Sequence, residues 1–297
     1  MTKIATRPIF MAVAGVATLS GVGAYAWQAS AKAPVLEIYV WDTPGSPSIF
    51  IRTPSDKRIL IDGGANSDVV RRLTSVIPFY SRRIDTIIVT KGEAKRATGL
   101  VDVTDRYDIG NILIPGMDLV SLGLASTTDP AYSALLDAAK KRNIDVQSVL
   151  AGKKLELDKE VYLDAMFPVP KDSFEYSRAS DPELAMRLSY RDTSILLAGA
   201  ISTKVQKLLS KDTKRSNALV VYQSLAPSNY SKEFISAVAP DSLVYSQTAS
   251  KSGTGKPSKK KKPQTDSLAG VLMDHRFNIK EKKTIKIVSD GARVTVQ

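Results

Sequence analysis

The sequence contains no cysteine and one histidine, His275, among its 297 residues. The absence of cysteine excludes disulfide bonds, thiolate metal sites and a cysteine nucleophile. A single imidazole without partners makes no zinc site, and one remote histidine gives no support to a serine–histidine–aspartate triad. We therefore predict no catalytic residue, no bound metal and no cofactor.

Acidic residues are also scarce, with 30 Asp and Glu against 42 Lys and Arg, which gives a formal net charge of +12. The excess is local. Three positive charges lie in residues 1–34 and six in Thr248–Gln264, which leaves three for the rest of the chain. Because most of the chain is nearly balanced in charge, its basicity alone does not indicate a nucleic-acid-binding face.

One long apolar run is present, the nineteen residues Ile9–Trp27. It is long enough to span a bilayer, and the positive charges before it predict a cytoplasmic N-terminus with the following domain outside the cell membrane. Ala29-Ser30-Ala31 offers a cleavage site, so the alternatives are a single-pass anchor, a signal peptide that releases a secreted protein, and a merely buried helix. Residues 1–34 form this N-terminal segment in each case.

Residues 35–297 have the apolar content of an ordinary globular domain. Short β-type runs alternate with segments of helical spacing, and a run of strands from Val146 to Ala198 predicts a second sheet. This pattern predicts an α/β domain, an αββα sandwich. The expected helices are Ala65–Ile77, Ala97–Tyr107, Asp129–Arg142, Ile201–Ser210, Ser231–Val238 and Asp266–Met273, with a closing hairpin over Thr284–Val288 and Arg293–Val296.

A low-complexity insertion interrupts the second half of this domain at Thr248–Gln264. It has six lysines, no acid and no apolar residue beyond Ala249. Such a segment cannot offset its ordering entropy by burial, so we predict a mobile loop. It is either a solubilising insertion or a contact for DNA phosphates, acidic lipid or anionic wall polymer through Lys259, Lys260, Lys261 and Lys262.

The stretch Ile87–Leu100 reads as a strand that delivers polar side chains to the mouth of a sheet. Its polar residues are Lys91, Glu93, Lys95 and Arg96. Ammonium and guanidinium groups have no lone pair to give a metal ion, so of these four residues only Glu93 could bind one. The cations are either solvated on a loop or form a site for phosphate or carboxylate.

With Leu60–Gly64, LIDGG, this stretch resembles the metallo-β-lactamase-like fold in the form found at the C-terminus of ComEC-type competence proteins, which internalise DNA. The resemblance covers about residues 35–297. It implies histidine at position 91, aspartate at 95 and histidine at 96, where this chain has Lys91, Lys95 and Arg96. The glycine that ends the family's loop is present as Gly99.

The same resemblance implies further lost ligands along the chain. The opening-strand aspartate is kept as Asp42, Gly199 is kept, the bridging aspartate is Ala200, and Tyr222-Gln223 stands at the family's histidine pair. The resemblance also implies a Gly-x-Gly-Asp turn where this chain has Pro44-Gly45-Ser46-Pro47, so four separate ligand stations are empty. Asp42 and Asp62 are expected to hydrogen-bond neighbouring turn backbone, and Gly63 and Gly64 to supply backbone conformations closed to other residues.

These observations predict a membrane-anchored, metal-free pseudoenzyme outside the cell, in a competence-related role, that binds DNA or another polyanion without cleaving it. One alternative is a metal-dependent, nuclease-like hydrolase with an atypical site. Another is a structural scaffold that binds a membrane-protein partner, with the basic loop on lipid head groups.

Overall fold

The computed structural model describes residues 34–117, 122, 128–177, 182–223, 229–246 and 275–297. The chain divides into two compact units, residues 1–34 and 35–297, and the second is described here. Ile9–Trp27, the lysine-rich segment Thr248–Gln264 and the expected helix Asp266–Met273 lie outside the described residues. Within the described part, no helix is long and apolar enough to cross a membrane.

The first sheet has eight strands in the order β15-β14-β1-β2-β3-β4-β5-β6. Strands β3 to β6 run parallel to one another, while β14, β1, β2 and β3 pair antiparallel in turn. The strands are β1 (Leu36–Trp41), β2 (Ser48–Arg52), β3 (Arg58–Ile61), β4 (Arg83–Ile88), β5 (Asp108–Pro115), β6 (Asp145–Val149), β14 (Thr284–Ser289) and β15 (Val294–Val296).

The second sheet has seven strands in the order β13-β12-β11-β10-β9-β8-β7. Its strands are β7 (Lys154–Asp158), β8 (Val161–Phe167), β9 (Ala185–Tyr190), β10 (Thr193–Gly199), β11 (Ala218–Val221), β12 (Ser242–Tyr245) and β13 (Arg276–Asn278). The second sheet begins later than expected, because the strand at Val146 pairs with β5 and completes the first sheet.

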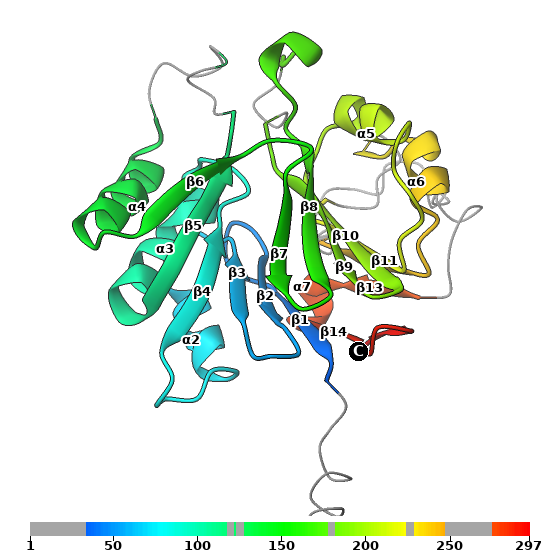
Figure 1. The fold of residues 1–297 in the computed structure, drawn as a ribbon. Coiled ribbons are helices and arrows are strands. Elements are labelled where there is room, and N and C mark those ends of the chain that lie inside the picture. Colours follow the sequence, from blue (N-terminus) through cyan, green and yellow to red (C-terminus); the bar gives the residue numbers. More distant parts are fainter. Residues whose placement is uncertain (1–33, 118–121, 123–127, 178–181, 224–228, 247–274) are drawn as a thin grey trace, which may run out of the picture. The chain divides into compact units, whose positions relative to one another are not determined.

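Helices cover the outer face of each sheet (Figure 1). The first sheet carries α2 (Asp68–Thr74), α3 (Ala94–Arg106) and α4 (Pro130–Lys141); the second carries α5 (Thr203–Leu209) and α6 (Lys232–Val238). A 3-10 turn, η1 (Lys171–Ser173), and a short helix, α7 (Ile279–Lys282), complete the described elements. Helix α2 is shorter than predicted and begins after Ser67, whose side chain makes no capping hydrogen bond.

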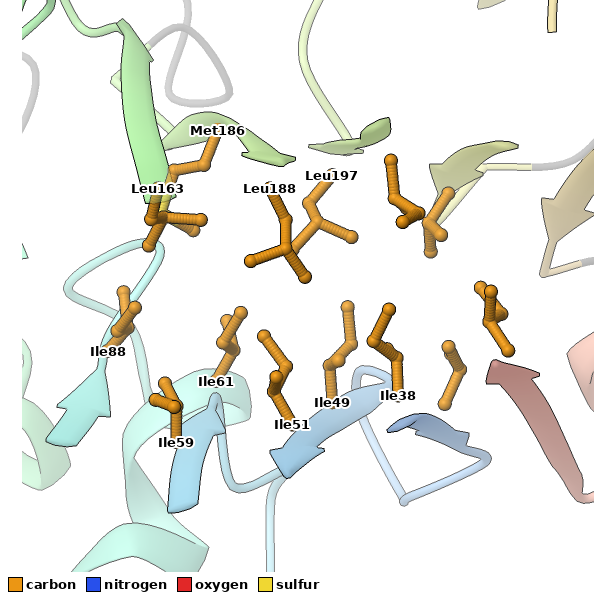
Figure 2. Close-up of a cluster of buried hydrophobic side chains, with 14 of the residues drawn as sticks. Ile38, Ile49, Ile51, Ile59, Ile61, Ile88, Leu163, Met186, Leu188 and Leu197 are labelled. Atoms are coloured by element: carbon orange, nitrogen blue, oxygen red, sulfur yellow. The ribbon is translucent and has the colours of Figure 1, made fainter. Parts of the chain in front are cut away.

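The central core lies between the two sheets. Ile38, Ile49, Ile51, Ile59, Ile61 and Ile88 point from the first sheet toward Leu163, Met186, Leu188 and Leu197 of the second (Figure 2). Alternate residues face the helices instead, as Leu60 does between Ile59 and Ile61. Strands buried on both faces read as continuous apolar runs. The predicted α/β class is confirmed, with helix, sheet, sheet and helix layers.

Candidate functional site

The charged loop after β4 places Arg96 inside the protein. Arg96 lies in the first turn of α3, and its side chain is only 3% exposed. Its guanidinium donates to Glu183 Oε1 at 2.7 Å and to the Ser46 hydroxyl, and lies 3.5 Å from Asp62 Oδ2. The ring of Tyr222 lies against it, with 4.8 Å between Cζ and the ring centroid.

Asp62 follows the last residue of β3 and is completely buried. Its carboxylate accepts hydrogen bonds from the backbone N–H of Thr90 at 2.8 Å and from the Thr90 hydroxyl at 2.6 Å. Burial raises the pKa of Asp62 to about 6, against the opposing effects of Arg96 and Thr90. This carboxylate thus ties together the ends of two adjacent parallel strands.

Glu183, which sequence reasoning missed, is the closest counterion of Arg96. It precedes β9, is buried, and its Oε1 also accepts from the backbone N–H of Ala200 at 2.8 Å. Gly199 makes room for it: its φ is +57°, and a Cβ there would lie 2.2 Å from Glu183 Oε1. Glu183 does not belong to a sequence motif. The one signal that could have indicated it is that a buried arginine requires a carboxylate partner.

Four side chains form one buried network around Arg96, which we call the arginine cluster: Asp62, Arg96, Glu183 and Tyr222. Burial lowers the pKa of Arg96, but the charges of Glu183 and Asp62 outweigh it and raise that pKa above its ordinary value. Burial, with the nearby charge of Asp62, raises the pKa of Tyr222 well above its ordinary value. One donor, Nε of Arg96, is buried without a hydrogen-bond partner. Arg96 therefore remains a cation held by the protein's own carboxylates.

A second, smaller group contains the other cations of the loop. The Lys91 side chain is 7% exposed, and its Nζ lies 2.5 Å from Glu93 Oε1; Lys95, 48% exposed, reaches Glu93 Oε2 at 3.2 Å. The contact between Lys91 and Glu93 is an ion pair. Burial raises the pKa of Glu93, but the two lysines outweigh it and lower that pKa. Lys91 and Arg96 are thus neither solvated nor open to an external anion.

The remaining predicted positions divide between this site and other parts of the domain. Tyr222 belongs to the arginine cluster, and the backbone N–H of Ala200 donates to Glu183 of that cluster. Gln223 Nε2 donates to the carbonyl of Ile201 at 2.8 Å. The side chain of Asp42 does not bond turn backbone as expected, because Lys280 and Lys283 of the α7 region hold it at 2.5 and 2.8 Å. His275 is exposed and lies just before β13.

Close backbone packing fixes the loops around the site. The N–H of Gly63 donates to the carbonyl of Arg96 at 2.8 Å. A Cβ on Gly99 would lie 2.1 Å from the carbonyl oxygen of Gly63, so β3 and α3 approach closely only because both residues are glycine. Gly64 has a φ of +73°, which agrees with the expected conformational role. Gly63 has no positive φ, so that expectation is wrong for Gly63, which is needed for close packing against Leu100 instead.

The side chains at this site do not fit a metal ion. The two carboxylates nearest Arg96 already accept hydrogen bonds from it or from Thr90. Among the residues that the structure describes, no group of three or more His, Cys, Asp or Glu is placed to hold a metal. A dication would meet repulsion of roughly 5 kcal/mol or more from a buried guanidinium about 5 Å away at an effective dielectric near 20.

No protein-family model and no curated protein matches this sequence. Solved structures of similar fold include the metallo-beta-lactamase fold protein YhfI from Bacillus subtilis, at 11% identity and a TM-score of 0.47, over 71% of this chain and 85% of that one. Zn2+-bound PqqB from Methylobacterium extorquens is 11% identical, with a TM-score of 0.46, over 67% and 75%. Since these TM-scores lie below 0.5, the layered architecture rests on the strand pairing described above.

Proposed function

We propose that this chain is a non-catalytic relative of the metallo-β-lactamase-like domains, with motifs that resemble those of the C-terminal domain of ComEC-type competence proteins. The observation that carries the proposal is Arg96, buried to 3% exposure and 2.7 Å from Glu183. In the motif alignment Arg96 stands where the family has a histidine ligand. The guanidinium of Arg96, paired with carboxylates of this chain, then takes the place of the metal ion that the family binds.

Metal analysis of the purified full-length chain tests this proposal. We expect less than about 0.1 zinc per chain after exposure to Zn2+, because buried cations oppose the ion. We also expect no hydrolysis of DNA, of a phosphodiester or of a β-lactam. Zinc near unit occupancy that is lost in Glu93→Gln would contradict the proposal and favour an atypical hydrolase, since Glu93 is the one carboxylate in the loop.

The proposed role is binding at the outer face of the cell membrane, with DNA or another polyanion as the ligand. Two sequence features support it: the apolar segment Ile9–Trp27 as anchor and the four consecutive lysines Lys259–Lys262 as contact. Resistance of the full chain to alkaline carbonate extraction tests the anchor. A chain released by carbonate with residues 1–31 removed would instead be a secreted protein.

Salt-dependent DNA binding tests the lysine segment. Replacing Lys259–Lys262 with alanine should flatten the slope of log affinity against log salt by up to about 3–4, because each phosphate contact contributes about 0.9. A matched control removes four charges from exposed lysines elsewhere: Lys140, Lys141, Lys211 and Lys214. Equal slopes in both variants, or no DNA binding, would favour a scaffold for a membrane-protein partner.

A further inference from the structure

The loop between α2 and β4 exposes two aromatic side chains. Phe79 and Tyr80 are 86% and 78% exposed, and their rings meet edge to face at 5.5 Å between centroids. Phe79 also borders an apolar hollow of about 150 Å³ lined by aliphatic side chains such as Val70 and Ile77. Phe79 and Tyr80 are the most exposed large hydrophobic side chains in the described part of the chain.

Two arginines line the same hollow, Arg82 and Arg106. Both are exposed, and neither has an ion-pair partner among the residues that the structure describes. The neighbouring Arg83, by contrast, pairs with Asp85 and Asp108. We call Phe79, Tyr80, Arg82 and Arg106 the aromatic edge. Its cations remain available to an external anion.

The aromatic edge lies at the end of the first sheet where the domain begins. Strand β1 is antiparallel to β2, β2 is antiparallel to β3, and β3 is parallel to β4, so β1 and β4 start at the same edge. Both starts lie at the bottom of the view in Figure 1. Three strand spacings separate them, about 14 Å.

The chain before β1 limits how far this edge can lie from a membrane. Eight residues, numbers 28–35, separate Trp27 from Leu36, the first residue of β1. Fully extended, this connection spans at most about 32 Å. If Ile9–Trp27 spans the bilayer, the start of β1 lies within that distance of the bilayer surface.

We propose that the aromatic edge docks on the surface of an anionic phospholipid bilayer, with Phe79 and Tyr80 in the interface and Arg82 and Arg106 on lipid phosphates. Aromatic rings with adjacent cations suit this region, where one part of a side chain meets acyl chains and the other meets charged head groups. This inference rests on the membrane anchoring proposed above. It adds an orientation: the carboxyl ends of β3 and β4, with the arginine cluster, point away from the membrane.

The absence of native cysteine allows a direct test by single-cysteine labelling. The full chain carrying Phe79→Cys or Ser67→Cys is reconstituted in nanodiscs of phosphatidylglycerol and phosphatidylethanolamine, and each cysteine receives an environment-sensitive fluorophore. Ser67 is the matched control, because it is exposed at the opposite end of α2. We expect lipids with a doxyl quencher near the head group to quench position 79 about 3-fold more than position 67. The difference should shrink in phosphatidylcholine alone, or when Arg82→Gln and Arg106→Gln are added.

Carbonate extraction of the same samples separates this inference from the anchoring. Equal quenching at both positions in a chain that resists extraction overturns the inference and leaves the anchor intact. If extraction shows that the chain is not anchored, the released chain should still sediment with phosphatidylglycerol vesicles, and should do so several-fold less in Phe79→Ser. No sedimentation overturns the inference. Concentration-dependent shielding of position 79 in lipid-free detergent also overturns it, because that result assigns the surface to a second copy of the chain.

Discussion

The parallel strands β3 and β4 have charged residues beyond both of their ends, and the two ends hold them in opposite ways. At the carboxyl ends, Arg96 is buried beside Asp62 and Glu183. At the amino ends, Arg82 and Arg106 are exposed beside exposed aromatic rings. Arg58, the first residue of β3, is also at the amino end, but it is buried and pairs with Asp56 at 2.6 Å. The buried arginines at both ends therefore have carboxylate partners, whereas Arg82 and Arg106 form open surface.

Counterions account for this difference. A buried guanidinium is tolerable only when carboxylates and hydrogen bonds replace the water it loses, and the carboxyl end brings two carboxylates from distant segments to Arg96. Within the part of the chain that the structure describes, the amino end supplies carboxylates to Arg83 but none to Arg82. The comparison predicts that variants of the arginine cluster change stability, whereas variants of the aromatic edge change only binding.

The largest expected effect is that of Glu183→Gln. Gln keeps the side-chain volume but removes the closest charge from Arg96, so we expect the free energy of unfolding to fall by about 3–5 kcal/mol. Chemical denaturation measures this. The control is Glu175→Gln, whose carboxylate pairs with Lys204 at 3.0 Å but is 87% exposed. The free energy of unfolding of Glu175→Gln should stay within about 0.5 kcal/mol of that of the parent chain. Similar losses in both variants would mean that burial does not distinguish these ion pairs.

The next effect is a pH dependence of opposite sign at two aspartates. The pKa of Asp62, about 6, lies above its usual value of 3.8, so the folded state binds more protons than the unfolded state between these values. Asp62 therefore makes the free energy of unfolding fall as pH rises from about 4 to about 6, by about 3 kcal/mol.

The pKa of Asp42 is lowered instead: burial raises it, but hydrogen bonds from Lys280 and Lys283 outweigh burial. Asp42 therefore stabilises the folded state above pH 3.8, and this stabilisation is lost as the pH falls below 3.8.

Denaturation from pH 3 to pH 7 tests both signs by difference from the parent chain. Asp62→Asn should lack the fall between about pH 4 and pH 6, because the amide does not titrate there. Asp42→Asn should keep that fall and lose the stabilisation that the parent gains as pH rises toward 4. Parallel curves for the parent and Asp62→Asn would show that Asp62 titrates alike in both states.

A smaller loss is expected from Gly199→Ala. The new Cβ would meet Glu183 Oε1, and the residue would keep a φ of +57°. We expect a loss of about 2 kcal/mol in the free energy of unfolding, from backbone strain and a displaced counterion. Gly152→Ala separates the two causes, because Gly152 has a φ of +89° and nothing within 4 Å of the new Cβ. If both variants lose the same free energy, contact with Glu183 contributes nothing.

The smallest effect on stability is expected at the aromatic edge. The double variant Phe79→Ser, Tyr80→Ser removes two exposed rings, so its free energy of unfolding should stay within about 0.5 kcal/mol of the parent. Thermal or chemical denaturation of the lipid-free chain measures this. A loss near 2 kcal/mol would show that the rings stabilise the fold, and that the two ends of the strands do not differ as described.

Much of the fold was predictable from local pattern. The helix over Pro130–Lys141 begins at Asp129-Pro130 as expected, because an aspartate cap and a proline in the first turn act locally. The closing hairpin also follows from its Asp290-Gly291 turn. The assignment of β6 to the first sheet was not predictable, since apolar periodicity says nothing about which strand is the neighbour. Strand β13 was missed because three residues carry too little pattern.

The sequence by itself determined which side chains are scarce: it has no thiol and one imidazole, and the loop after β4 carries Lys91, Lys95 and Arg96. Only the tertiary structure decided that Arg96 is buried, that Glu183 is its partner and that Asp42 belongs to a different cluster. The physical reason is that residue type fixes which charges a side chain can carry. The stability of a charge, however, depends on solvent exclusion and on counterions that long-range folding brings from far along the chain.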